Sequence, residues 1–265
     1  MKNISFGMPT LIEKQNLEDS VLLCKELGLD FIELNMNMPD YQIEQLENTE
    51  TLRQIAERYD IYFTIHLEEN LNVCDFNHAV AHAYQDTVRR AILVAKKLEI
   101  PILNMHMNHG VHFTLPDKKV ELFERYNAEY MKNIEHFLKL CEDTVGDSNV
   151  RICIENTDGY QAFEKDALNY LLASPVFGLT WDIGHSHAAA NVDEPFILRH
   201  SDKLMHFHIH DGVKNKNHLV LGSGEIDIGQ RLSIAAQIGC RCVIETKTEQ
   251  ALIQSVNWLD AIANR

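Results

Sequence analysis

The sequence predicts an α/β fold in the form of a single (β/α)8 barrel over residues 1–265. Two observations predict it. Short apolar runs alternate with longer amphipathic runs eight times, and such alternation produces a parallel sheet covered by helices. Eight strand–helix units in 265 residues also match the size of a closed barrel. The alternative, an open doubly wound sheet, usually carries a glycine-rich phosphate loop after its first strand, but Pro9, Thr10 and Leu11 follow that strand here.

The expected strands are short runs of apolar and β-branched residues. In chain order they are Asn3–Met8, Phe31–Leu34, Tyr62–Leu67, Ile102–Met107, Val150–Glu155, Gly178–Asp182, Leu204–His210 and Arg241–Glu245. The expected helices are Leu17–Leu27, Ile43–Tyr59, Asn77–Leu98, Leu115–Asp143, Ala162–Leu172, Phe196–Arg199, Ile228–Ile238 and Glu249–Ile262. The first helix has apolar residues at helical spacing and is followed by Gly28, a typical C-cap. The third stops before Pro101, and Leu115 with Pro116 opens the fourth.

Composition narrows the class of protein. The formal net charge of −15 argues against nonspecific attraction to a polyphosphate, because nucleic-acid-binding proteins usually carry a basic face. The cysteines form no CxxC pair, which argues against a zinc knuckle and fits a reducing compartment. The first ten residues lack an apolar signal core, and no run is long enough to span a membrane. We therefore expect a cytoplasmic protein without membrane partners. The sequence leaves open whether the chain forms a homo-oligomer.

Three histidines share one face of the strand at Leu204–His210. Successive side chains of a strand point to opposite faces, so His206, His208 and His210 lie together, opposite Met205, Phe207 and Ile209. Imidazoles on a buried face are costly unless their nitrogens are used, and a divalent metal is the obvious user. The structural alternative is a surface strand with a polar stripe.

Six polar residues lie at the carboxyl ends of six separate expected strands. They are His66, His106, Glu155, Asp182, His208 and Glu245. In a barrel these ends converge on one mouth, and six such groups buried together need a counter-charge. Mixed carboxylate and imidazole ligation is typical of Mn²⁺, Mg²⁺, Co²⁺ or Zn²⁺. The simplest ligand set comes from four consecutive strands: Glu155, Asp182, His208 and Glu245. His66 and His106 come from the opposite arc, where they either hold a second metal or bind substrate oxygens.

Several motifs resemble those of the xylose-isomerase-like TIM-barrel superfamily. They are IENTDG at 154–159, WDIGH at 181–185, HFHIHDG at 206–212, HLVLGSGEID at 218–227 and VIE at 243–245. The superfamily includes sugar isomerases and epimerases, sugar-acid dehydratases and type-2 AP endonucleases. The resemblance makes the four-residue set the metal ligands. It makes Glu155 and Glu245 the catalytic acid/base pair as well.

The same resemblance assigns substrate contacts. It implies substrate-binding positions at His66, His106, His185, Asp211, Lys214 and His218. His185 is also a candidate ligand of a second metal. Lys214 stands where many sugar epimerases carry an arginine, so a point charge replaces a planar fork at that position.

We therefore expect a divalent-metal-dependent isomerase or epimerase of a small sugar or sugar phosphate. A metal that chelates two oxygens of a hydroxy-ketone acidifies the C–H bond between them, and two carboxylates can then remove and return the proton. One alternative is a metal-dependent sugar-acid dehydratase or lyase. Another is a zinc-dependent AP endonuclease, but Lys216 replaces an aspartate ligand of that family, and the net charge disfavours DNA. A barrel that binds a ligand without catalysis is the remaining alternative.

Other residues near the expected mouth have simpler explanations. Trp181 is expected to pack between barrel and helices, and His109 to be solvated or bonded within its loop. Glu33 either faces the mouth or forms a hydrogen bond within its strand. His206 is expected to orient metal ligands.

Overall fold

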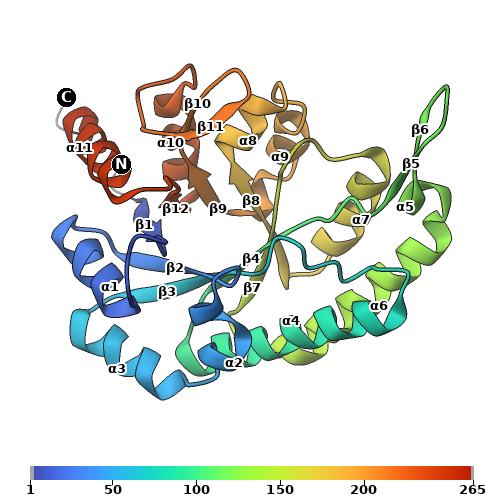
Figure 1. Ribbon diagram of the computed structural model, residues 1–265, viewed down its shortest axis with the longest axis horizontal. Coiled ribbons are helices and arrows are strands. Elements are labelled where there is room, and N and C mark those ends of the chain that lie inside the picture. The colour runs from blue at the N-terminus through green and yellow to red at the C-terminus, as the bar shows by residue number, and fades with distance from the viewer. Residues whose placement is uncertain (1–2, 264–265) are drawn as a thin grey trace.

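The computed structural model describes residues 3–263, and eight parallel strands in it close into a barrel surrounded by helices (Figure 1). The barrel strands are β1 (Ser5–Pro9), β2 (Phe31–Asn35), β3 (Tyr62–His66), β4 (Ile102–His106), β7 (Arg151–Glu155), β8 (Phe177–Asp182), β9 (Leu204–Ile209) and β12 (Arg241–Ile244). Their order around the barrel is β1-β12-β9-β8-β7-β4-β3-β2. The predicted (β/α)8 fold is confirmed. The ends of the predicted domain, residues 1–2 and 264–265, lie outside the described residues.

The helices cover the outside of the barrel. They are α1 (Leu17–Glu26), α2 (Ile43–Leu46), α3 (Thr49–Tyr59), α4 (His78–Leu98), α5 (Leu122–Arg125), α6 (Asn127–Val145), α7 (Ala162–Leu172), α8 (Ile183–Ala188), α9 (Glu194–Arg199), α10 (Ile228–Ile238) and α11 (Glu249–Ala263). Side-chain caps fix several of their first turns, as where Asn16 accepts from the amide of Asp19 and Asp227 accepts from that of Gln230. No helix within residues 3–263 has the length and apolar character needed to cross a membrane.

Strand register brings the polar strand ends to one level. His106 pairs with Glu155, and Asp182 pairs with His208. The opposite faces of the same strands build the core, where Trp181 lies 5.6 Å from Phe207 between ring centroids. Arg231 of α10 covers Trp181, which is fully buried. The predicted packing of Trp181 between barrel and helices is confirmed.

The prediction of a helix that begins at Leu115 was wrong. Residues 112–121 form an antiparallel hairpin of β5 (His112–Thr114) and β6 (Lys119–Glu121), which projects from the barrel in Figure 1. The Leu115 amide donates to the carbonyl of Lys118 at 2.8 Å, so Pro116 and Asp117 occupy a turn. Proline suits the start of a helix and the second position of a turn equally, and the pairing of the flanking strands decides between them.

Two further departures concern short elements. The expected helix Ile43–Tyr59 is divided into α2 and α3. The loop after β9 forms a second hairpin, made of β10 (Asp211–Val213) and β11 (Lys216–Leu219).

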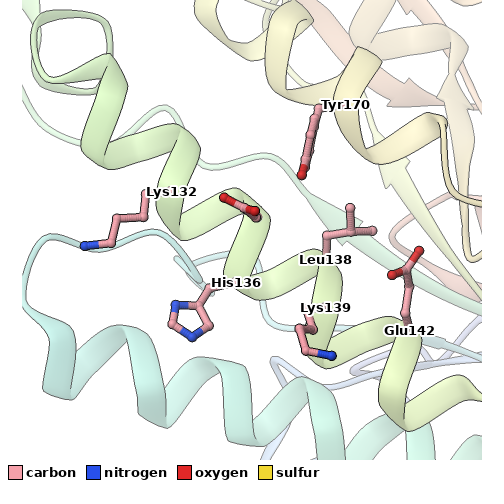
Figure 2. A pocket seen from close by; sticks show the side chains of 7 residues that line it. Lys132, His136, Leu138, Lys139, Glu142 and Tyr170 are labelled. Atoms are coloured by element: carbon pink, nitrogen blue, oxygen red, sulfur yellow. The ribbon is translucent and has the colours of Figure 1, made fainter.

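A pocket of about 480 Å³ lies on the outer helical layer, beside α6 and Tyr170 of α7 (Figure 2). Its lining consists of Lys132, Glu135, His136, Leu138, Lys139, Glu142 and Tyr170. None of these residues belongs to the polar strand ends, which lie at the mouth of the barrel.

Candidate functional site

The four expected metal ligands converge at the mouth of the barrel. Glu155 and Asp182 end β7 and β8, His208 lies in β9, and Glu245 follows β12 directly. One ligand atom from each lies within 4.8 Å of the others. Three of the residues are at most 1% exposed, and the Glu245 side chain is 13% exposed. The neighbouring strand ends that the sequence indicated therefore do reach a common point.

Unpartnered polar atoms meet at the centre of this group. Nδ1 of His208 lies 3.3 Å from Oε1 of Glu155 and 3.0 Å from Oε2 of Glu245. These three atoms are buried and have no hydrogen-bond partner among the described residues. Burying such atoms unpaired is costly, whereas a divalent cation would satisfy all three at once. The donor set of three carboxylates and one imidazole fits such a cation.

The charges at this point also fit a cation. Burial raises the pKa of the Glu155 carboxyl, but the charges of His208 and His106 outweigh it and hold that pKa well below its usual range. The pKa of Glu245 is lowered in the same way, against burial, by His208 and Lys247. In return, Glu155 raises the pKa of His208 well above its usual range although burial lowers it. Without a cation, protonated His208 neutralises the carboxylates, so metal binding would displace that proton.

His66 and His106 approach Glu155 from the other side. Nε2 of each lies 3.4 Å from Oε2 of Glu155. Asn104 donates to the same oxygen, a contact that the sequence analysis missed because it considered only the carboxyl ends of the strands and Asn104 lies in the middle of β4. Burial lowers the pKa of His66, but the hydrogen bond with Glu155 and the charge of that carboxylate outweigh it and raise the pKa to about 9. The arrangement leaves both predicted roles of these histidines open, a second metal or substrate oxygens.

His210 holds Asp182 in place. Nε2 of His210 lies 3.0 Å from Oδ2 of Asp182, and Nδ1 of His210 accepts from the backbone amide of His218 at 2.8 Å. Because Nδ1 accepts an amide proton, the ring proton sits on Nε2 and is donated to Asp182. The ring packs directly against Gly184, where a Cβ would lie 1.8 Å from its Cε1.

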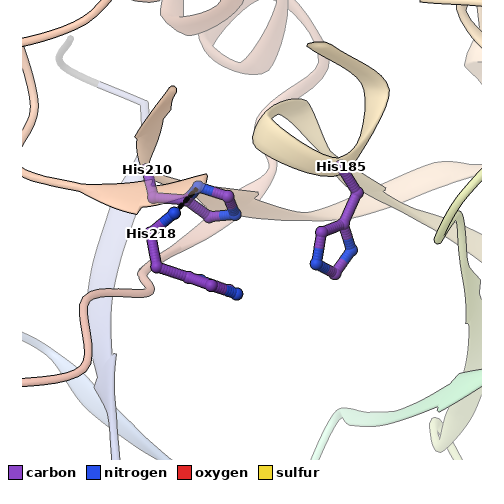
Figure 3. Close-up of side chains that lie close together, drawn as sticks. All are labelled: His185, His210 and His218. Atoms are coloured by element: carbon purple, nitrogen blue, oxygen red, sulfur yellow. Dashed lines mark hydrogen bonds between the residues drawn. The ribbon is translucent and has the colours of Figure 1, made fainter. Parts of the chain in front are cut away.

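The histidines His185, His210 and His218 form a second group beside the ligand set (Figure 3). Figure 3 shows His210 and His218 side by side, with His185 opposite them on α8. Both nitrogens of His210 are already engaged, so only His185 and His218 offer a free nitrogen. Burial lowers the pKa of His218 to about 4, which keeps its ring neutral. A neutral imidazole at this position can exchange hydrogen bonds with a substrate hydroxyl.

Asp211 organises the loop that follows β9. Its carboxylate accepts from the amides of Gly212 and Gly224 at 2.8 Å each and from that of Ile226 at 3.2 Å. It is 1% exposed. These contacts give Asp211 a structural role in the loop, and its contact with substrate stays a prediction. The same holds for Lys214, whose amide donates to Glu225 at the turn between β10 and β11.

Of two charged residues beside the ligand set, the sequence analysis missed Lys247 and left the direction of Glu33 open. Lys247 places Nζ 2.8 Å from Oε1 of Glu245, two residues after the strand-end position on which the sequence argument rested. Glu33 in β2 points into the barrel interior and lies against His206 and His208 of β9, so its contacts are with other strands and not within its own. Lys247 could have been recognised as a positively charged residue close to a strand end that carries a carboxylate.

His109 joins two loops at the rim of the mouth. Its Nδ1 lies 2.6 Å from Oε1 of Glu164, a fully buried residue of α7, and its other ring nitrogen contacts Asp158. These contacts run to another loop and to α7, so His109 is not bonded within its own loop. The hydrogen bond with Glu164 raises the pKa of His109 to about 9, although burial opposes this.

We expect the contribution of His109 to stability to depend on pH. Because its pKa is higher in the folded protein than the ordinary 6.5, the contribution is complete below that value and is lost as pH rises through about 9. His109→Gln should lower the free energy of unfolding by about 1 kcal/mol at pH 6 and by much less at pH 10. Urea unfolding of both proteins at the two pH values measures this. His112→Gln, on the exposed β5, is the control, and an equal loss for His109→Gln at both pH values would contradict the expectation.

The chain is similar in sequence to a known family and to known proteins. The family model described as "Xylose isomerase-like TIM barrel" matches residues 21–262. An uncharacterized protein of Methanocaldococcus jannaschii, MJ1614, is 27% identical over 228 residues, covering 80% of this chain and 79% of the relative.

Solved structures with the same fold cover almost the whole chain. A D-tagatose 3-epimerase-like protein matches with a TM-score of 0.77 and 22% identity, covering 98% of this chain and 97% of that one. The 3-keto-D-glucoside 4-epimerase YcjR of E. coli matches with a TM-score of 0.78 and 16% identity, covering 97% and 99%. The protein IOLI, solved with a bound zinc atom, matches with a TM-score of 0.74 and 17% identity, covering 98% of both chains.

Proposed function

Because the chain belongs to the xylose isomerase-like TIM barrel family, we propose that it is a divalent-metal-dependent isomerase or epimerase of a small sugar or sugar phosphate. One observation carries the proposal. Ligand atoms of Glu155, Asp182, His208 and Glu245 lie within 4.8 Å of one another, and several of them are buried without a partner. The epimerase names of similar structures and the zinc atom in one of them support the substrate class and the metal.

Each residue of the mouth has a part in this reaction. A divalent ion held by Glu155, Asp182, His208 and Glu245 would polarise the carbonyl of a hydroxy-ketone and so acidify the neighbouring C–H bond. Glu155 and Glu245 remove and return the proton, and they approach His208 from β7 and from the end of β12, with β8 and β9 between them. Lys247 favours the ionised form of Glu245, which a base requires. The predicted substrate contacts of His66, His106, His185 and His218 orient the sugar hydroxyls.

The endonuclease alternative has less support. A third metal there would need an acidic ligand near His218, but Lys216 in β11 is exposed and basic. His210 lies beside His185 and His218, but both of its ring nitrogens already contact other groups of the protein. It therefore offers no free nitrogen to a third metal. A dehydratase would use the same metal ligands as an isomerase or epimerase, so only the reaction products distinguish these alternatives.

Metal analysis and a solvent isotope experiment test the proposal together. We expect each purified chain to retain at least about one divalent ion. After incubation in D₂O with a panel of keto-sugars and their phosphates, the recovered sugar should contain deuterium. Loss of water from a sugar acid would favour the dehydratase, and cleavage of abasic DNA the endonuclease. A protein that binds no divalent metal and turns over none of these substrates would refute the enzyme proposal.

A further inference from the structure

A buried glutamate lies directly behind His208, on the side away from the other expected ligands. Glu33, in the middle of β2, is 2% exposed. It reaches across the barrel interior to β9, which is separated from β2 by β1 and β12. There Oε1 of Glu33 lies 2.8 Å from Nε2 of His208.

The two ring nitrogens of His208 therefore face two different environments. Nδ1 faces Glu155 and Glu245, where the metal is proposed, while Nε2 faces Glu33. A metal-binding histidine commonly donates its second ring N–H to a carboxylate, which fixes both the tautomer and the ring orientation and makes the ligand more basic. Glu33 places a carboxylate oxygen within hydrogen-bonding distance of Nε2, a buried nitrogen that has no other partner among the described residues.

The two oxygens of Glu33 have separate partners. Oε2 accepts from Oγ1 of Thr64 at 2.9 Å and lies 3.0 Å from Nε2 of His206. These two contacts anchor the carboxylate, and Oε1 is left to face His208.

We propose that Glu33 is a positioning residue that holds His208 with its proton on Nε2 and its free Nδ1 directed at the metal. His206 and Thr64 anchor Glu33 rather than bind metal themselves. The inference rests on the metal site of the proposed function, and it adds a residue that contacts neither metal nor substrate.

Metal affinity is the measurement that tests this role. Glu33→Met keeps the volume of the side chain and removes the acceptor, so we expect it to weaken binding of Co²⁺ or Zn²⁺ by about 10–100-fold in competition with a chelator. Glu33→Gln keeps an acceptor oxygen but not the charge, and its affinity should fall between those of the wild type and Glu33→Met. The visible spectrum of the Co²⁺ protein should change with Glu33→Met, because the His208 ring is no longer held.

Asp30→Asn is the matched control, since it neutralises a carboxylate next to the opposite end of β2, where Asp30 accepts from Ser5 and Phe6. Its metal affinity should equal that of the wild type. A folded Glu33→Met protein with wild-type affinity would overturn the proposal. If Glu33→Met does not fold, a crystal structure of the zinc-loaded wild type decides: zinc on Nδ1 of His208 supports the proposal, and zinc on Nε2 overturns it. A wild type that binds no metal would instead refute the proposed function.

Discussion

Glu245→Gln is expected to lower kcat by about 10²–10⁴-fold even when the metal is saturating. An amide cannot accept and return a proton at a substrate carbon, whereas its carbonyl oxygen can still contact a metal. The variant should also bind the metal more weakly, because Oε2 of Glu245 is one of the unpartnered atoms that face Nδ1 of His208. Turnover must therefore be measured over a range of metal concentrations, so that loss of the ion and loss of the base are separated.

Deuterium incorporation is a second measurement of the effect of Glu245→Gln on proton transfer. With the proposed acid/base pair, deuterium incorporation from D₂O into recovered sugar should fall with Glu245→Gln as far as turnover does. Glu249→Gln is the control, because this glutamate lies four residues further along at the start of α11 and pairs with Lys14 outside the ligand set. Its activity should stay within about twofold of the wild type, since exposed ion pairs contribute little. Full activity of Glu245→Gln at saturating metal would remove Glu245 from the acid/base pair.

The barrel was predictable because each of its strands carries a local signal. An apolar run followed by a polar residue marks the strand and also its carboxyl end, as at Glu155 and Asp182. The prediction of a helix at Leu115 was wrong because the local signal there is ambiguous. That signal fits two structures, and the choice between them depends on the pairing of Phe113 with Val120, which the residues at the turn do not encode.

Strand periodicity made it possible to predict which side chains of the candidate site share a face, but not which residues they contact. Alternation along β9 correctly placed His206, His208 and His210 on one face, but it does not say what each one meets. The three imidazoles differ in their partners: His206 and His208 both contact Glu33, His208 also contacts Glu155 and Glu245, and His210 contacts Asp182. Contacts across a barrel join residues as far apart as Glu33 and His206, and no local pattern specifies them.

These contacts divide the three histidines by function. His208 is the only one of them that presents a ring nitrogen to the expected ligands while another carboxylate, Glu33, lies behind it. His206 helps to anchor that carboxylate, and His210 supports Asp182. The mouth therefore has two layers of side chains. Glu33 and His210 form the supporting layer, which orients the expected ligands, as precise metal sites require.

Gly184→Ala tests whether the second of these supports matters. Gly184 lies in α8, where alanine would ordinarily stabilise the helix by about 1 kcal/mol relative to glycine. A Cβ at this position, however, would lie 1.8 Å from Cε1 of His210, so the ring must move and its contact with Asp182 must break. We therefore expect the opposite sign: a loss of about 1–3 kcal/mol in the free energy of unfolding. Metal affinity should fall by about 10–100-fold.

Gly229→Ala provides the matched control, because Gly229 lies in the first turn of α10 and its Cβ would meet only Asp227, at 3.6 Å. Helix propensity alone acts there, so this variant should be as stable as the wild type or more so, with unchanged metal binding. Urea unfolding and chelator competition on the three proteins measure both quantities. If Gly184→Ala resembles Gly229→Ala in both, the ring of His210 has room to move, and its contact with Asp182 does not position the ligand. If Gly184→Ala alone loses metal affinity, the support of Asp182 by His210 is part of what makes the cation site.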